Sequence, residues 1–117
     1  MPRKEPGEPY YRLTDGEAAD MYGDDDVVIV DVRRPDEYAA GHIKGATFIP
    51  VDDVLARIEE LPTDKKLLFI CEIGVRSGLA CEMAAAMGID TELLYNIESG
   101  TQHWIEAGNP ASYGDEA

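Results

Sequence analysis

Two continuous apolar runs, Val27–Val30 and Leu67–Cys71, constrain the fold of this chain more than any other feature. Each run has the length of a strand and lacks the polar–apolar alternation of a strand with one face in water. Such runs are typical of strands covered on both faces, as in a parallel sheet. Helical segments separate the predicted strands. This alternation predicts an α/β fold, with a parallel central sheet of about five strands and helices on both faces.

Caps and breakers predict the elements around these runs. Thr14 and Glu17 form a capping-box pattern, which predicts a helix running toward Tyr22. Pro35 begins a short helical turn that Gly41 ends. Strands are also expected at residues 46–49 and 92–95, and a last helix at residues 100–107.

Apolar spacing predicts two more helices. One is indicated by a set of apolar residues that recurs at helical spacing up to Pro62: Val51, Val54, Leu55, Ile58 and Leu61. The other covers residues 77–87, and Gly88 ends it. Its expected apolar face comprises Leu79, Ala80, Met83 and Met87, with Cys81 off that face.

The length and the ends of the chain set the domain organisation. With 117 residues, the chain has the length of one domain, expected at residues 10–110. Residues 1–9 are rich in Pro, Gly and charge and are expected to form a flexible arm. Residues 111–117 are expected to form a short tail.

The composition excludes several partners. Asp and Glu number 24 against 10 Lys and Arg, so the net charge is −14. Nucleic acid and anionic membranes bind clustered cations, and neither is an expected partner. The two cysteines, Cys71 and Cys81, form no CxxC pair, which fits free thiols in a reducing compartment. The chain opens with no secretory signal, and no apolar run could span a bilayer, so a cytoplasmic location is expected.

Cys71 lies at the carboxyl end of a predicted strand, where parallel sheets bind ligands. A short loop containing Gly74 follows it, and then a helix begins. Unpaired N–H groups of the loop and of the first helical turn form an anion site, which favours the thiolate, the nucleophilic form of cysteine. Arg76 adds a fixed positive charge. The segment therefore predicts a nucleophilic Cys71, and the alternative is an inert, buried cysteine.

The spacing within this loop separates two classes of enzyme. Tyrosine-type phosphatases place five residues between Cys and Arg, whereas four separate Cys71 from Arg76. A shorter loop makes a smaller anion site, which suits one sulfur atom better than a tetrahedral phosphate. A phosphatase or an arsenate reductase is therefore disfavoured. The segment resembles the six-residue active loop of the rhodaneses.

A second segment is similar to the first signature of the rhodanese family. It comprises Asp31-Val32-Arg33, Glu37-Tyr38, Gly41-His42-Ile43-Lys44-Gly45-Ala46 and Ile49-Pro50. Gly100 and Trp104 resemble the closing segment of the family, in which Ser99 stands where a glycine is usual. The resemblance extends from about Leu13 to Pro110.

The resemblance implies a rhodanese-like fold and a sulfurtransferase in which Cys71 is the catalytic nucleophile and carries a persulfide. The expected donor is thiosulfate, a polysulfide or a protein persulfide, and the expected acceptor is a thiol or a cyanide-like nucleophile. Backbone N–H groups along the loop would bind the persulfide: those of Glu72, Ile73, Gly74, Val75 and Arg76. No cofactor and no metal are expected. The alternative function is a non-catalytic rhodanese-like binding or regulatory module, against which the presence of Cys71 argues.

Three polar residues are expected to support the site. Asp31 is interpreted as a structural hydrogen-bond partner, and Arg33 as an ion-pair partner, with Glu37 as its carboxylate. Ser77 is interpreted as the cap at the start of its helix. Arg76 has two equally weighted roles, binding of the incoming anion or pairing with a carboxylate that pins the loop.

The remaining candidates have structural interpretations. His42 is expected to lock a turn through hydrogen bonds, and His103 and Trp104 are expected to pack the last helix. Cys81 is expected to pack against the fold and not to act as a resolving thiol for Cys71. Glu72 departs from the cationic entrance of thiosulfate-using rhodaneses, and at the mouth of the site it would repel a dianionic donor.

Overall fold

The computed structural model describes residues 2–116 and is built around one parallel sheet. Its strands lie in the order β1-β6-β5-β2-β4, and every neighbouring pair is parallel. Their bounds are Tyr11–Leu13 for β1, Val27–Asp31 for β2, Thr47–Phe48 for β4, Lys66–Ile70 for β5 and Leu94–Ile97 for β6. The predicted α/β architecture with a five-stranded parallel sheet is confirmed.

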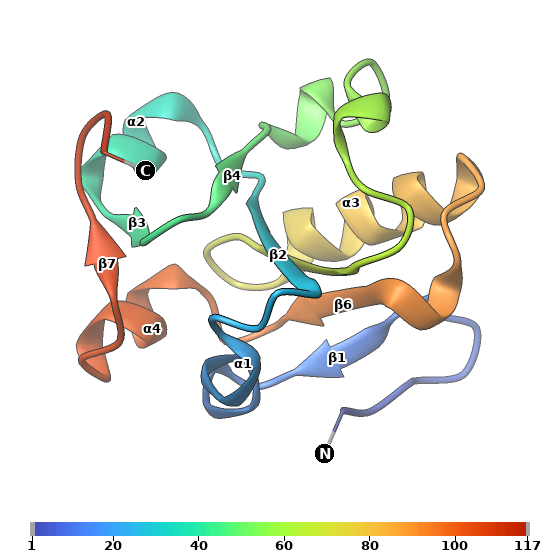
Figure 1. Ribbon diagram of the computed structural model, residues 1–117, viewed down its shortest axis with the longest axis horizontal. Helices are drawn as coiled ribbons and strands as arrows, with labels where there is room; N and C mark the ends of the chain where they lie inside the picture. Colours follow the sequence, from blue (N-terminus) through green and yellow to red (C-terminus); the bar gives the residue numbers. More distant parts are fainter. Residues whose placement is uncertain (1, 117) are drawn as a thin grey trace.

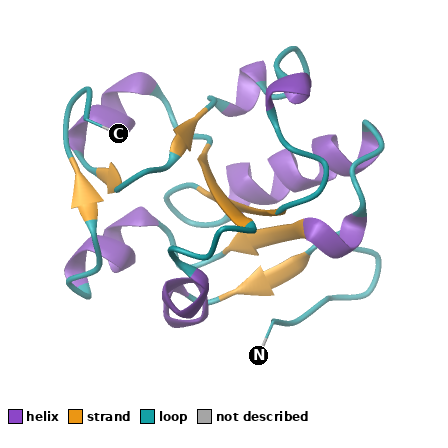
Figure 2. Cartoon of the chain, viewed as in Figure 1, coloured by secondary structure: helices purple, strands orange, loops and turns teal. Residues whose placement is uncertain are grey.

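Helices cover both faces of this sheet (Figures 1 and 2). The helices are α1 (Asp15–Met21), α2 (Pro35–Ala40), α3 (Val75–Ala86) and α4 (Thr101–Glu106). Helix α3 packs on one face, and α1 and α4 contribute to the core on the other. No helix within residues 2–116 has both the length and the apolar character needed to cross a membrane.

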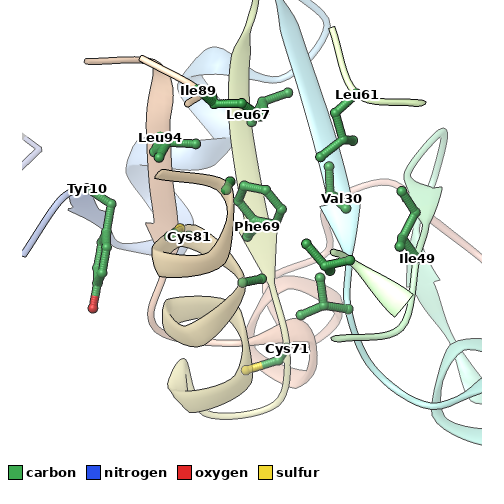
Figure 3. Packing of buried hydrophobic residues seen from close by; sticks show 14 residues of the cluster. Tyr10, Val30, Ile49, Leu61, Leu67, Phe69, Cys71, Cys81, Ile89 and Leu94 are labelled. Carbon is green, nitrogen blue, oxygen red and sulfur yellow. The ribbon is translucent and has the colours of Figure 1, made fainter. Parts of the chain in front are cut away.

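The two apolar runs form the central strands β2 and β5, as expected. All four residues from Leu67 to Ile70 are fully buried. Leu67 and Phe69 point to the α3 side, where Val30 and Cys81 also pack (Figure 3). Leu68 and Ile70 belong to the other cluster, with Trp104 of α4. Each of these strands therefore needs a continuous apolar run, because both of its faces are covered.

Local signals position the short helices as predicted. The Thr14 hydroxyl accepts a hydrogen bond from the Glu17 N–H at 3.2 Å, and the Glu17 carboxylate accepts one from the Thr14 N–H at 2.8 Å. This capping box begins α1. Pro35 begins α2, and Gly41 ends it with a φ of 149°. Helix α2 thus follows directly after β2, close to the carboxyl edge of the sheet.

Several short elements carry no clear signal in the sequence. Strand β1 has three residues, and β3 (His42–Ile43) pairs antiparallel with β7 (Ala111–Ser112). Strand β7 lies beyond the predicted domain boundary at residue 110. In the predicted arm, Arg3 forms an isolated bridge with Arg12. The flexibility of residues 1–9 in solution stays a prediction.

The helix predicted up to Pro62 is wrong. Two 3₁₀ segments, Val51–Asp53 and Ile58–Glu60, replace it, and turns join them. Val51 and Val54, like Ile58 and Leu61, lie three residues apart, which is the period of a 3₁₀ turn. This conformation buries those side chains at least partly and leaves Leu55 47% exposed.

Two other boundaries differ from the predictions. Helix α3 begins at Val75 and not at residue 77, and its buried face consists mostly of small residues: Ser77, Gly78, Ala80, Cys81 and Ala84. Small side chains allow the helix to lie close to the sheet, whereas Leu79 and Met87 of the predicted face are 46% and 53% exposed. Strand β6 starts two residues later than predicted because Thr91–Leu93 form a 3₁₀ turn, capped by the Asp90 carboxylate.

Candidate active site

Cys71 directly follows β5, and its side chain points toward the first turn of α3 (Figure 3). It is only 1% exposed. The backbone N–H of Gly74 donates to Cys71 Sγ at 3.1 Å. Gly74 is the N-cap of α3 and has a left-handed φ of 86°, which a side chain would disfavour. The loop therefore curls back over the sulfur and aims an N–H group at it, as the sequence predicts.

A polar network continues from the sulfur into the sheet. Ser77 Oγ lies 3.3 Å from Cys71 Sγ and donates to Asn96 Oδ1 at 2.5 Å. Asn96 Nδ2 in turn donates to the carbonyl oxygen of Gly74 at 3.0 Å. Ser77 lies inside the first turn of α3 and contacts the sulfur, so its predicted role as the helix cap is wrong.

Asn96 is the residue of this network that sequence reasoning missed. It lies on β6 between Tyr95 and Ile97, and it is 3% exposed. A polar residue inside an apolar strand is a usable signal, because a buried amide needs hydrogen-bond partners. The sequence does not reveal which partners those are.

The segment that follows β6 supports the backbone beneath the loop. The Thr101 N–H donates to the carbonyl oxygen of Cys71 at 3.0 Å. Gly100 has a φ of 91°, and a Cβ there would clash with the carbonyl oxygen of Glu72. This close approach explains why a glycine stands at this position. Ser99, which replaces the usual glycine, accepts a hydrogen bond from the Asp15 N–H at 3.3 Å.

Arg76 pairs with a carboxylate on α2. Its two terminal nitrogens donate to the two carboxylate oxygens of Glu37 at 2.6 and 2.9 Å. This guanidinium holds the pKa of Glu37 at about 2, below its ordinary value of 4.5. The contact pins the loop, one of the two roles predicted for Arg76. Binding of an anion by Arg76 stays a prediction.

Arg33 is buried beside the loop and binds three acceptors. It donates to Asp31 at 2.8–3.2 Å, to the carbonyl oxygen of Gly41 at 2.8 Å and to Glu72 at 2.6 Å. The predicted ion pair between Arg33 and Glu37 is wrong. Arg33 turns inward to the buried Asp31, and α2 presents Glu37 to Arg76 instead. Asp31 has the structural role that was predicted for it.

The surface around the loop carries exposed apolar side chains and a glutamate. Ile73 and Val75 are 75% and 67% exposed, and they flank Gly74. The Glu72 side chain is 37% exposed and is held by Arg33. A cavity of about 180 Å³ lies between this pair and α4. Arg33 and Arg76 are thus engaged by carboxylates.

The other candidate residues lie outside this network. His42 is fully buried, its ring nitrogens lie 2.8 Å from the Tyr38 carbonyl and 2.5 Å from the Glu116 carbonyl, and its predicted turn-locking role is confirmed. Trp104 is fully buried, as expected, but His103 is exposed and the packing role predicted for it is wrong.

Cys81 packs against the fold, as predicted, but it lies on the buried face of α3, so its placement off the apolar face is wrong. It is fully buried, its Sγ lies 3.5 Å from the Tyr95 carbonyl, and burial raises its pKa well above the ordinary value. Among residues 2–116, no cluster of three or more His, Cys, Asp or Glu side chains is arranged to hold a metal ion.

Comparisons with known proteins bear on the family and the fold. A family model described as the rhodanese-like domain matches residues 14–107. The Bacillus subtilis protein YqhL is 40% identical over 76 residues, which span 65% of this chain but only 59% of that protein. A sulfurtransferase of Allochromatium vinosum is 34% identical over 86 residues, or 74% of this chain and 78% of that protein.

A solved structure supports the same likeness. The crystal structure of a rhodanese-related protein from Thermoplasma volcanium matches with a TM-score of 0.75 and 29% identity. The match covers 86% of this chain and 96% of that one.

Proposed function

Since this chain belongs to the rhodanese-like domain family, we propose that it is a sulfurtransferase that carries a sulfane sulfur as a persulfide on Cys71. The observation that carries the proposal is the placement of Cys71 Sγ under the Gly74 N–H, at the start of α3. A relative of 34% identity that is named a sulfurtransferase supports the same reaction class.

In the first step, the Cys71 thiolate attacks the outer sulfur of the donor. A bond forms between Cys71 Sγ and this sulfur, while the bond between the sulfur and the rest of the donor breaks. The bonding electron pair leaves with the donor remainder, which is sulfite for thiosulfate and a polysulfide shorter by one sulfur for a polysulfide. The N–H groups of residues 72–76 stabilise the negative outer sulfur of the persulfide, as an oxyanion hole stabilises oxygen.

In the second step, a thiolate or a cyanide-like acceptor attacks the outer sulfur. The acceptor gains the sulfur, and the electron pair of the broken bond returns to Cys71 as a thiolate. The cycle needs no oxidant, reductant, metal or cofactor. Free thiols persist in a reducing compartment, so we place the reaction in the cytoplasm.

The entrance favours a donor other than thiosulfate. Arg33 and Arg76 are paired with carboxylates, and Ile73 and Val75 form an apolar rim. With a net charge of −14 on the whole chain, the field at the entrance disfavours a dianion. A donor of lower charge, a protein persulfide, is therefore the proposed donor, and a thiol is the proposed acceptor.

The mass of the intact protein tests this proposal. Reduced wild-type, Cys71→Ser and Cys81→Ser proteins are exposed separately to thiosulfate and to polysulfide. We expect the wild type and Cys81→Ser to gain one sulfur atom and Cys71→Ser to gain none. A thiol added afterwards should remove the sulfur from the loaded protein.

Two outcomes would redirect the assignment. If no protein gains sulfur from either donor, the non-catalytic binding module becomes the better description. Hydrolysis of an aryl phosphate by the wild type that is lost in Cys71→Ser would instead favour a phosphatase.

A further inference from the structure

The amide of Asn96 has only one orientation that satisfies its neighbours. The carbonyl oxygen of Gly74 can only accept a hydrogen bond, so the atom of Asn96 that faces it must be Nδ2. Oδ1 then faces Ser77, at 2.5 Å from its hydroxyl oxygen. Because Oδ1 can only accept, the Ser77 hydroxyl must donate its single proton to Asn96.

The direction of this hydrogen bond determines whether the Ser77 hydroxyl presents its proton or its lone pairs to Cys71 Sγ. Its Oγ lies 3.3 Å from Cys71 Sγ and presents lone pairs, because its proton points to Asn96. A thiol can donate to those lone pairs, whereas a thiolate would be repelled by them. The Gly74 N–H has the opposite preference, since a donor stabilises the anion.

We infer that Asn96 is a positioning residue that directs the Ser77 hydroxyl away from Cys71, so that the lone pairs of the hydroxyl and not its proton face the resting sulfur. When Cys71 loses its proton, the Ser77 hydroxyl turns from Asn96 Oδ1 to the sulfur and donates to it. The inference concerns the site of the proposed function, but its readout needs no sulfur transfer, so the two can fail separately.

The substitutions that test this inference leave the charged side chains around Cys71 Sγ unchanged. Arg76, in the first turn of α3, is paired with Glu37, and Glu72 follows Cys71 and is paired with Arg33. On α3, the neighbouring titratable group is the thiol of Cys81. On the segment after β6, Glu98 approaches Gly74 and binds Arg12. None of these groups is altered by Asn96→Leu or Ser77→Ala. Asn96→Leu also removes the hydrogen bond to the Gly74 carbonyl, so the experiment must separate the hydroxyl from the loop.

The experiment measures the rate of iodoacetamide alkylation of Cys71 against pH, by mass spectrometry of the peptide that contains it. In Asn96→Leu, the hydroxyl of Ser77 loses its acceptor and is free to donate to the thiolate. We expect the midpoint of the profile to fall by about one pH unit, a tenfold gain in thiolate fraction at low pH, as one hydrogen bond to a charged group allows. In the double variant Asn96→Leu with Ser77→Ala, this shift should disappear.

Asn96→Asp is the matched control, because it keeps an acceptor for Ser77 but removes the amide donor to Gly74. We expect its midpoint to stay or to rise. If Asn96→Asp lowers the midpoint as Asn96→Leu does, loosening of the Gly74 loop explains both results and the inference is overturned. A shift that persists in the double variant overturns it as well. Should circular dichroism show that Asn96→Leu is unfolded, Asn96→Ala replaces it with the same expected sign.

Discussion

Cys71 and Cys81 lie on one strand–loop–helix unit and are almost equally buried, at 1% and 0% exposure. Their polar partners differ. Cys71 receives the N–H of Gly74, and Cys81 lies 3.5 Å from the carbonyl oxygen of Tyr95 (Figure 3 places both on the α3 side of the sheet). An N–H donor stabilises a sulfur anion, whereas a carbonyl oxygen stabilises only the protonated thiol.

The two thiols therefore differ in their polar partners and not in their burial. At Cys81, an apolar environment disfavours the anion, and its pKa is raised well above the ordinary value. At Cys71, a curled loop at the start of a helix brings the Gly74 N–H to a sulfur that is equally hidden from solvent. The difference between the two thiols lies in which groups face the sulfur.

The largest expected effect comes from Gly100→Ala, which should disturb the surroundings of Cys71 and spare those of Cys81. The new Cβ would clash with the carbonyl oxygen of Glu72, and the left-handed φ of 91° adds strain. We expect a loss of about 2–4 kcal/mol in the free energy of unfolding, and slower alkylation of Cys71. Urea denaturation and the alkylation rate measure the two effects.

Gly23→Ala is the matched control for this substitution. Gly23 has nearly the same φ, 90°, but no atom lies within 4 Å of the Cβ it would gain. The Gly23→Ala variant should lose only about 1 kcal/mol in the free energy of unfolding, and the alkylation rate of Cys71 should be unchanged. Equal losses in the two variants would mean that the clash with Glu72 is relieved without cost.

Cys81→Ser should have a smaller effect, on stability only. The hydroxyl must be buried in the core that now holds the thiol, and it has one acceptor, the Tyr95 carbonyl. We expect the free energy of unfolding to fall by about 1–2 kcal/mol, with sulfur loading on Cys71 unchanged. A loss of sulfur loading in a folded Cys81→Ser protein would contradict the contrast between the two thiols.

Glu37→Gln tests the ion pair that pins the loop of Cys71. The pKa of Glu37 is about 2 in the folded protein and 4.5 as an ordinary value, so the paired carboxylate stabilises the fold above pH 4.5. This contribution is lost as the pH falls through 2. At neutral pH the variant should be less stable by about 1 kcal/mol, and the difference should shrink in acid. Urea denaturation at several pH values checks this, and a difference independent of pH would exclude the ion pair as its cause.

The smallest expected effect is on donor selection at the entrance. Glu72→Gln removes a negative charge and leaves Nη1 of Arg33 without its carboxylate. We expect the KM for thiosulfate to fall about two- to threefold at low salt and less at high salt. The control is Glu60→Gln, which removes an exposed glutamate paired with Arg57 that does not line the cavity beside Glu72. An unchanged KM in Glu72→Gln would remove Glu72 as a determinant of the donor.

Much of this site is readable in the sequence, because its parts are local. An apolar strand that ends at Cys71 and a short loop with Gly74 are neighbours in the chain. The placement of Cys71 at the start of a helix therefore follows from local signals. The buried strands and the capping box at Thr14 are predictable for the same reason. Arg76 was assigned a carboxylate partner as one of two roles.

Other parts depend on pairings between distant segments. The sequence does not say which carboxylate meets which arginine, and Arg33 was assigned the partner that Arg76 binds. The link from Ser77 to Asn96 spans 19 positions and joins a helix to a strand. The region up to Pro62 was misjudged because 3₁₀ turns and an α-helix bury similar apolar spacings.

The position of the bound sulfur tests the contrast between the two thiols most directly. Wild-type protein is treated briefly with polysulfide, its persulfides are trapped by alkylation, and the peptides that contain Cys71 and Cys81 are compared by mass spectrometry. The account predicts the added sulfur on the Cys71 peptide and none on the Cys81 peptide. Sulfur on Cys81, or equally on both, would contradict it.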